Sequence, residues 1–247
     1  MKKKVFVLTL SVAALVLLLL SLLAHDAVIP SSAGTDPISS SPGAAAFAAP
    51  APADPHLAQA QGQNADTMAW LTVPGTNIDG PVQQADDNEY YLRRDELGQP
   101  SHQGCIYADY ECDLSGAELS MNTILYGHTF TLPGQDPDLG FGQLSRYLDP
   151  DFARENSFIF LSVEDQMFTF QVISAGMAAA DAEQTSILAA PSWEQQQELI
   201  RLANERNVLP EALKSVAGQK LLTLSTCTND SDTRLIIVAQ LINGGEE

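Results

Sequence analysis

The sequence predicts a mainly β fold of the α+β class, arranged as a mostly antiparallel sheet or a closed barrel. Short apolar segments recur between turn-forming residues from about residue 64 onward, and only a few segments have helical spacing. The chain also has no internal repeat. Many short strands with few helices are typical of antiparallel sheets and closed barrels, because each sheet must bury one face.

The first 24 residues predict export. Residues 1–4 contain three lysines and form a short cytoplasmic stub, and residues 5–24 are an uncharged apolar run long enough to cross a bilayer as a helix. A cleaved signal peptide is the alternative, but the run exceeds the usual signal core and no clean A-x-A site follows it. We expect an uncleaved single-pass anchor, and either interpretation exports the rest of the chain.

Residues 25–63 are predicted to form an extracellular tether. Ala, Pro, Ser and Gly dominate this stretch, which cannot bury enough apolar surface to fold alone. The remaining residues, 64–247, have a length that suits one globular domain.

The first half of this domain is predicted to contain a helix followed by strands. Residues 64–70 resemble a short capped helix that leads into a strand. Alternating apolar residues punctuated by Pro-Gly and Gly-Pro predict a hairpin over 70–82, and residues 87–92 form a short helical or turn segment. Strands are expected at 104–109 and 122–127, where apolar residues are bounded by glycine or polar residues.

The second half begins with a loop and a short helix. Residues 130–140 are rich in Pro and Gly, and residues 141–147 have the pattern of a short helix. The segments 157–163 and 166–175 are expected to pair as a β-hairpin.

The clearest helix of the sequence spans residues 192–205. Ser192 can cap its first turn. Its expected buried face, at helical spacing, consists of Trp193, Gln196, Ile200 and Ala203.

Two strands, 221–227 and 234–238, are expected to follow this helix and to be joined by a polar turn. If they pair antiparallel, Cys227 and Arg234 lie opposite one another on the same face. A thiol beside a fixed cation is the arrangement that a nucleophile and its oxyanion stabiliser require.

Charge excludes two classes of partner. The chain has 12 basic and 31 acidic residues, and three lysines precede the anchor, so the exported part has a formal charge of −22. Nucleic acid and anionic lipid headgroups would repel such a surface. The acidity is best explained as a means of keeping an extracellular domain soluble.

The chain has three cysteines, an odd number for an exported protein, so at least one thiol is unpaired or pairs between chains. Cys105 and Cys112 could form a disulfide if a turn brings them together, and Cys227 would then be the unpaired cysteine. These three cysteines and His102 are conceivable metal ligands, but no Cys-x-x-Cys spacing supports a metal site. We therefore expect no metal.

A cysteine nucleophile needs a base, and histidine is the usual one. His25 and His56 flank the tether, and His102 lies in a polar loop. His128 differs because it follows the strand 122–127 directly, and a strand end is a rigid platform for a catalytic group. His128 is therefore the expected base. Taken alone, Cys227 is better explained as a small buried hydrophobe and Arg234 as a surface charge, so these residues leave an enzyme plausible but unproven.

The motifs around these residues resemble those of the sortase family. Residues 223–227, Thr-Leu-Ser-Thr-Cys, and 234–238, Arg-Leu-Ile-Ile-Val, are similar to the sortase signature T-L-x-T-C followed by R-L-x-V. Residues 122–128, Asn-Thr-Ile-Leu-Tyr-Gly-His, resemble the histidine segment of the same family. Residues 70–82, 87–92 and 141–144 are similar to further sortase segments in the expected order, and a long helix before the last two strands resembles class B in particular.

This resemblance implies a closed eight-stranded β-barrel with an N-terminal helix and no cofactor. It implies catalytic roles for Cys227 as nucleophile, His128 as general acid and base, and Arg234 as oxyanion stabiliser with the backbone N–H of Thr228. Positions matched to the groove that binds the sorting peptide are Asn88, Leu92, Tyr126, Ser225 and Thr226.

The implied function is that of a transpeptidase on the outer face of a Gram-positive-type membrane. Its substrates would be surface proteins with a C-terminal sorting signal, and its acceptor an amine of a cell-wall precursor or a pilin. The loop between Cys227 and Arg234 has only six residues, short for class B, and contains Asp230 and Asp232. Two alternatives remain: a secreted cysteine hydrolase that uses the same residues with water as acceptor, and a non-catalytic surface module.

Overall fold

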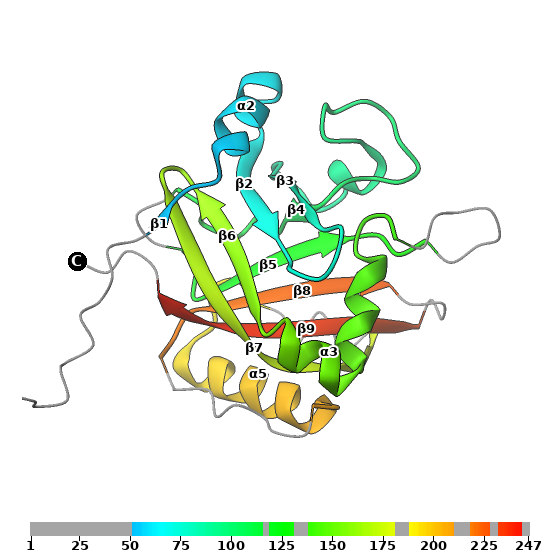
Figure 1. Ribbon diagram of the computed structural model, residues 1–247, viewed down its shortest axis with the longest axis vertical. Helices are drawn as coiled ribbons and strands as arrows, with labels where there is room; N and C mark the ends of the chain where they lie inside the picture. Colours follow the sequence, from blue (N-terminus) through cyan, green and yellow to red (C-terminus); the bar gives the residue numbers. More distant parts are fainter. Residues whose placement is uncertain are drawn as a thin grey trace, which may run out of the picture. The chain divides into compact units, whose positions relative to one another are not determined.

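A sheet that closes on itself forms the centre of the part of the chain that the structure describes. In the computed structural model its strands follow the order β7-β6-β2-β3-β4-β5-β8-β9, and β9 pairs back onto β7. A further short strand, β1, pairs with β7 outside this ring. Figure 1 shows the resulting barrel with few helices around it. The closed eight-stranded barrel expected from the resemblance is confirmed.

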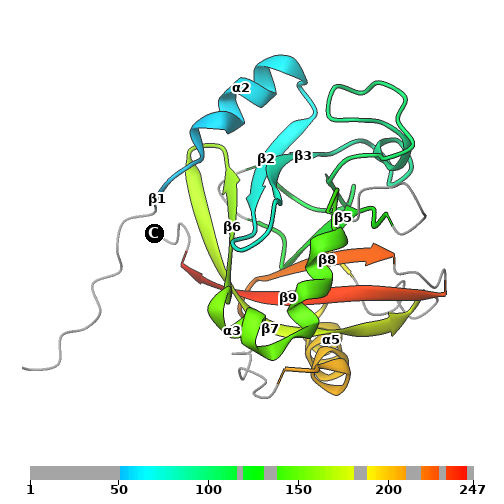
Figure 2. The same cartoon turned by 45° about the vertical axis from the view of Figure 1, so that its right-hand side comes forward.

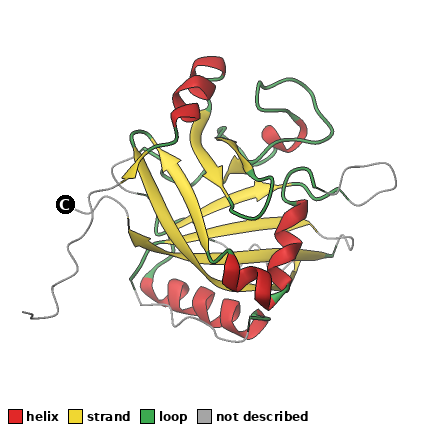
Figure 3. Ribbon diagram, in the orientation of Figure 1, coloured by secondary structure: helices red, strands yellow, loops and turns green. Residues whose placement is uncertain are grey.

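The structure describes residues 51–115, 119–130, 138–180, 188–209, 218–227 and 232–243. The strands are β1 (Ala51–Pro52), β2 (Thr67–Thr72), β3 (Asp79–Gln83), β4 (Tyr107–Ala108), β5 (Asn122–Gly127), β6 (Phe158–Val163), β7 (Gln166–Ala179), β8 (Leu221–Cys227) and β9 (Thr233–Asn243). The helices are α2 (Pro55–Gln63), η1 (Tyr91–Arg93), η2 (Gly142–Leu148), α3 (Pro150–Glu155) and α5 (Trp193–Arg206), of which η1 and η2 are 3₁₀-helices. Figure 3 separates these helices from the strands by colour.

Most neighbouring strands run antiparallel, but two pairs are parallel. β3 pairs parallel with β4, and β5 pairs parallel with β8 over their whole lengths, from Asn122 opposite Leu221 to Gly127 opposite Thr226. Parallel strands end at the same edge of a sheet. The carboxyl ends of β5 and β8 therefore lie side by side, although about 100 residues separate them in the chain.

Alternation along β8 and β9 divides their side chains between two apolar layers. Leu222, Leu224 and Ile237 belong to the main cluster inside the barrel. Leu221 and Ile236 belong to an outer cluster that also contains residues of α5. Burying such a side chain contributes roughly 1.5–3 kcal/mol, so these strands are fixed from both sides.

Helix α5 covers this outer layer and confirms the predicted helix at 192–205. Ser192 and Gln195 form the capping box: the Ser192 hydroxyl accepts from the Gln195 N–H, and the Gln195 side chain accepts from the Ser192 N–H. Its predicted face was partly wrong, because Trp193 is 55% exposed. The buried positions of α5 are Gln196, Leu199 and Ala203.

The short helix predicted at the start of the domain was wrong. Residues 64–70 do not form a helix: Thr67–Thr72 is strand β2, with alternate residues buried. The helix lies earlier, at α2, inside the stretch predicted as tether. The Asp54 side chain accepts from the His56 N–H and Pro55 occupies the first turn, so a strong helix start lies within the Ala-rich composition.

The other predicted elements are largely confirmed. β2 and β3 form the hairpin expected within 70–82, β6 and β7 form the second hairpin, and β5 covers 122–127 as expected. The segment 104–109 was overextended, because only Tyr107–Ala108 pairs as a strand. Among the described residues, no helix has the length and apolarity needed to cross a membrane; the predicted anchor at 5–24 lies outside them.

Candidate active site

The three predicted catalytic positions lie at the ends of three adjacent strands. Gly127 is opposite Thr226 in the parallel pair of β5 and β8, so His128 follows β5 at the level of Cys227, the last residue of β8. Cys227 is in turn directly opposite Arg234 of β9. Figure 2 shows β8 between β5 and β9. With neighbouring strands about 4.8 Å apart, the three backbone positions fall within roughly 10 Å.

The register also places these positions on one face of the sheet. Ile124 in β5, Leu221 in β8 and Ile236 in β9 all belong to the outer cluster. Successive positions of a strand alternate between the two faces of the sheet. Position 227 is therefore on the same face as position 221, and position 234 on the same face as position 236. Position 128 lies just beyond β5, four residues after Ile124, and is on this outer face as well. The expected pairing of Cys227 with Arg234 on one face is thus confirmed at the level of the backbone.

The His128 imidazole is held by a backbone carbonyl. His128 is half-buried, and its Nε2 lies 2.9 Å from the carbonyl oxygen of Leu92. A carbonyl can only accept, so Nε2 carries the proton of this bond. The other ring nitrogen, Nδ1, is therefore the one that can gain and lose a proton.

Two glycines allow close packing around His128. A Cβ at Gly127 would lie 2.7 Å from Cγ of Phe141, so the end of β5 tolerates no side chain there without a shift. Gly104 has a φ of 59°, and a Cβ there would lie 2.9 Å from Cδ2 of His128. A positive φ favours glycine. These contacts restrict where the imidazole can lie.

The Arg234 guanidinium is half-buried and donates from Nη1 to the carbonyl oxygen of Thr233 at 3.0 Å. Arginine remains charged at any pH relevant to proteins and presents several donors in a fixed plane. Arg234 therefore supplies a permanent cation from the strand position that is paired with Cys227.

Three of the predicted groove residues converge. The Asn88 amide and the Tyr126 hydroxyl both donate to Oδ2 of Asp109, at 2.9 and 3.0 Å. Leu92 and Tyr126 pack against one small cluster, formed by Tyr91, Cys105 and Tyr107. The structure thus brings Asn88, Leu92 and Tyr126 to one region beside β5.

The two predicted groove residues of β8 differ. Ser225 is opposite Tyr126 and has the outer parity, so it lies next to the other groove positions. Thr226 has the opposite parity and is 3% exposed; its hydroxyl donates to the Gly127 carbonyl oxygen at 2.7 Å and lies 2.7 Å from the Thr129 hydroxyl. Thr226 therefore joins the ends of β5 and β8 and is not brought to the groove side. Thr228 lies outside the described residues.

The other two cysteines are free, buried thiols. Burial raises the pKa of Cys112 to about 12, and burial raises the pKa of Cys105 still further. Neither thiol is a thiolate at neutral pH, so neither suits the role of nucleophile. Within the described ranges, no group of three or more His, Cys, Asp or Glu residues could hold a metal ion.

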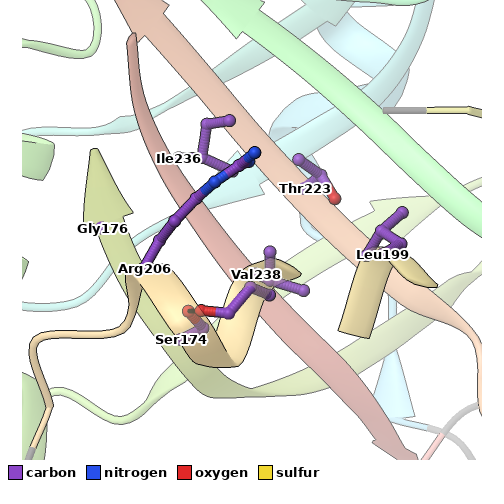
Figure 4. Close-up of a pocket in the computed structure, with 8 residues that line it drawn as sticks. Ser174, Gly176, Leu199, Arg206, Thr223, Ile236 and Val238 are labelled. Atoms are coloured by element: carbon purple, nitrogen blue, oxygen red, sulfur yellow. Dashed lines mark hydrogen bonds between the residues drawn. The ribbon is translucent and has the colours of Figure 1, made fainter. Parts of the chain in front are cut away.

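Two cavities lie near these strands. One, of about 260 Å³, opens beside His128 and Phe130, and three carboxylate side chains line it: Asp79, Glu96 and Asp138. The other lies between α5 and the outer face of β7, β8 and β9, as Figure 4 shows. It measures about 20 Å³, which suits a single water molecule. Only the first cavity is large enough for a small substrate group.

Two features of the site were missed by the sequence analysis. Asp109 was placed in a strand without a role, although an acidic residue that follows a buried strand is a detectable signal. The Leu92 carbonyl could not have been found, because a backbone acceptor has no signature in residue types.

Comparison with known proteins gives one consistent result. The family model described as "Sortase domain" matches residues 71–242. Sortase B of Listeria monocytogenes is 27% identical over 190 residues, which cover 75% of this chain and 74% of that protein. The structure of Clostridium perfringens sortase B has a TM-score of 0.67 at 26% identity and covers 75% of this chain and 99% of its own. A Staphylococcus aureus sortase B–substrate complex has a TM-score of 0.68 at 24% identity, with 78% and 87% covered, and shows the same fold.

Proposed function

The chain belongs to the sortase family, and on that premise we propose that it is a membrane-anchored class B enzyme that attaches exported proteins to an amine at the cell surface. Class B sortases are cysteine transpeptidases, and this chain is one of them. The observation that carries the site assignment is the register of β5, β8 and β9, which supports His128, Cys227 and Arg234 as one catalytic group.

The proposed reaction has two halves. In the first, the Cys227 thiolate attacks the carbonyl carbon of the threonine in a sorting motif, and Arg234 with the backbone N–H of Thr228 stabilises the oxyanion. The C–N bond then breaks, His128 gives a proton to the leaving amine, and a thioester remains on Cys227. In the second, His128 takes a proton from an incoming amine, which attacks the thioester; the new amide forms and the Cys227 thiolate leaves.

The hydrogen bond from His128 to Leu92 supports a specific proton path. Because Nε2–H is bound to the carbonyl, Nδ1 is the nitrogen that exchanges the proton in both halves. A cation beside a thiol favours the thiolate, which is the nucleophilic form. A thioester is a suitable intermediate, since amines attack it more readily than they attack an amide.

The proposed acceptor is an amine of a cell-wall precursor or a pilin. The cavity beside His128 supports an amine, because its three carboxylates would attract the cationic form that most primary amines have near neutral pH. The His128 imidazole at its wall could then take the proton that must leave before attack.

The experiment uses quenched fluorescent peptides with threonine at the scissile position. Cys227→Ala should abolish cleavage and remain folded, and the matched control Cys112→Ser should retain cleavage, because a hydroxyl can still accept from the Ile124 N–H that contacts Cys112 Sγ. Oligoglycine, a diaminopimelate-type amine and a lysine amide are then added. A new peptide–amine bond supports transfer; product that is only hydrolysed peptide with every amine supports the cysteine hydrolase instead.

The proposed location is the outer face of the cell membrane, with residues 5–24 as anchor and residues 1–4 in the cytoplasm. The acidic exported part should not bind an anionic membrane by itself. The full chain should therefore stay with the membrane fraction after a high-salt wash, and a chain that begins at residue 51 should be released. Release of the full chain by salt alone would contradict the anchor.

A further inference from the structure

We propose that Asp109 is a positioning residue for the sorting-peptide groove, acting through Asn88 and Tyr126. This inference rests on the function proposed above and adds a residue to it. Asp109 directly follows β4 and is 7% exposed. It contacts no catalytic position in the hydrogen bonds of the described residues, so it acts on substrate binding and not on the chemical step.

The Asp109 carboxylate is satisfied by three donors. Oδ2 accepts from the Asn88 amide at 2.9 Å and from the Tyr126 hydroxyl at 3.0 Å, and Oδ1 accepts from the Glu111 N–H at 2.9 Å. A buried carboxylate is costly unless such donors surround it, and hydrogen bonds to a charged acceptor are stronger than neutral ones. The bonds from Asn88 and Tyr126 therefore hold these two groove side chains in fixed orientations, and the bond from Glu111 fixes the carboxylate itself.

The backbone around Asp109 is equally fixed. Its N–H donates to the Ile124 carbonyl oxygen of β5, and its own carbonyl oxygen accepts from the Gln84 amide. The other end of the Asn88 side chain accepts from the Tyr110 N–H at 3.0 Å. Asp109 thus cannot move without displacing β5 or the segment that contains Asn88.

Asp109 joins the two segments that flank the catalytic histidine. Tyr126 lies two residues before His128 on β5, and Asn88 lies four residues before Leu92, whose carbonyl holds His128. Both segments contribute predicted groove residues, and one carboxylate fixes their spacing. A carboxylate is required because donors reach both of its oxygens. An amide at position 109 would turn its NH2 group either toward the Asn88 and Tyr126 donors or toward the Glu111 N–H.

The test is Asp109→Asn, measured with the sorting peptide that the wild-type enzyme cleaves best. Loss of one hydrogen bond to a charged group should raise KM about tenfold, with kcat within about twofold and an unchanged pH profile of kcat. Tyr126→Phe should raise KM similarly, and the double variant should lose little more than either single variant, because both changes remove the same contact.

The matched control is Asp66→Asn, which alters another carboxylate that accepts from a tyrosine hydroxyl, that of Tyr91 at 2.7 Å. Its KM should stay at the wild-type value. Peptide binding to the inactive Cys227→Ala variant, measured by fluorescence anisotropy, gives a second readout. Adding Asp109→Asn to this variant should raise the Kd for the peptide about tenfold.

If the wild-type enzyme cleaves the peptide and Asp109→Asn leaves both KM and Kd unchanged, the role of Asp109 is overturned while the proposed function stands. It is also overturned if kcat falls with KM constant, or if Asp66→Asn raises KM as much. A wild-type chain that cleaves no peptide at all would overturn the proposed function and this inference together, so the two failures are distinguishable.

Discussion

Arg234 is the residue whose chemistry is hardest to replace in this site. Its Cα is paired with that of Cys227, and its guanidinium is held by the Thr233 carbonyl. Lysine preserves the charge but concentrates it on one flexible ammonium with no planar fork of donors. The proposed oxyanion role therefore depends on arginine geometry as well as on charge.

We predict that Arg234→Lys lowers kcat about 10²- to 10³-fold, the usual cost of losing one oxyanion donor. Steady-state cleavage of a sorting peptide measures this effect. Arg201→Lys is the matched control, because Arg201 lies on the exposed face of α5 in ion pairs with Glu198 and Glu205. If Arg234→Lys is fully active, the positive charge alone is sufficient and the predicted need for arginine geometry is wrong.

The buried thiols make stability depend on pH. Burial raises the pKa of Cys112 from an ordinary value of 9.0 to about 12, so the folded state binds this proton more tightly than the unfolded state does. The stabilisation is fully present below pH 9 and is lost as pH rises toward 12. A group with a raised acid pKa thus favours unfolding at high pH.

We predict that the urea midpoint of the wild-type protein falls between pH 9 and pH 11, and that Cys112→Ser removes part of this fall. Thiol labelling checks the same point: at pH 8 the native protein should react at Cys227 and only the denatured protein at Cys105 and Cys112. Rapid labelling of Cys112 in the native state would contradict its burial.

At the scale of elements, β5 and β8 could be predicted to the residue because strong apolar runs end in Gly127 and in a polar turn after Cys227. α2 could not, because its Ala- and Gln-rich sequence buries only Leu57 and its composition resembles a tether. The strand predicted at 104–109 was too long, because only Tyr107–Ala108 pairs as a strand and the extent of pairing depends on tertiary structure.

The end of β5 depends on a residue without a side chain. A Cβ at Gly127 would meet three atoms of the Phe141 ring within 3.0 Å, and Phe141 is fully buried. The Phe141 N–H also donates to the His128 carbonyl oxygen at 2.8 Å. Any shift of Phe141 is therefore passed directly to the backbone of His128, the proposed general acid and base.

We predict that Gly127→Ala destabilises the protein by about 1–3 kcal/mol, the usual cost of overpacking, and lowers kcat more than tenfold. Thermal unfolding and peptide cleavage measure the two effects. Gly62→Ala is the control, because no atom lies within 4 Å of its Cβ position in α2. There a helical alanine should raise stability by up to about 1 kcal/mol and leave kcat unchanged.

At the scale of the whole molecule, the barrel creates the site by pairing strands that are remote in the chain. The parallel pairing of β5 with β8 and the return of β9 onto β7 place one end of three strands together. The sequence supplied the motifs and, through the resemblance, the barrel. It did not supply the register of β5 against β8, since about 100 residues separate them, nor the contacts of Asp109 and of the Leu92 carbonyl.

In the proposed reaction, Cys227 carries a thioester that an amine resolves. The most direct test is intact mass spectrometry of the protein mixed with a sorting peptide, followed by peptide mapping and by addition of an amine. We predict one acyl adduct, located on Cys227, that disappears as a peptide–amine product forms. An adduct on Cys105 or Cys112, or cleavage of the peptide by a protein that never carries an adduct on Cys227 even under rapid quenching, would contradict it.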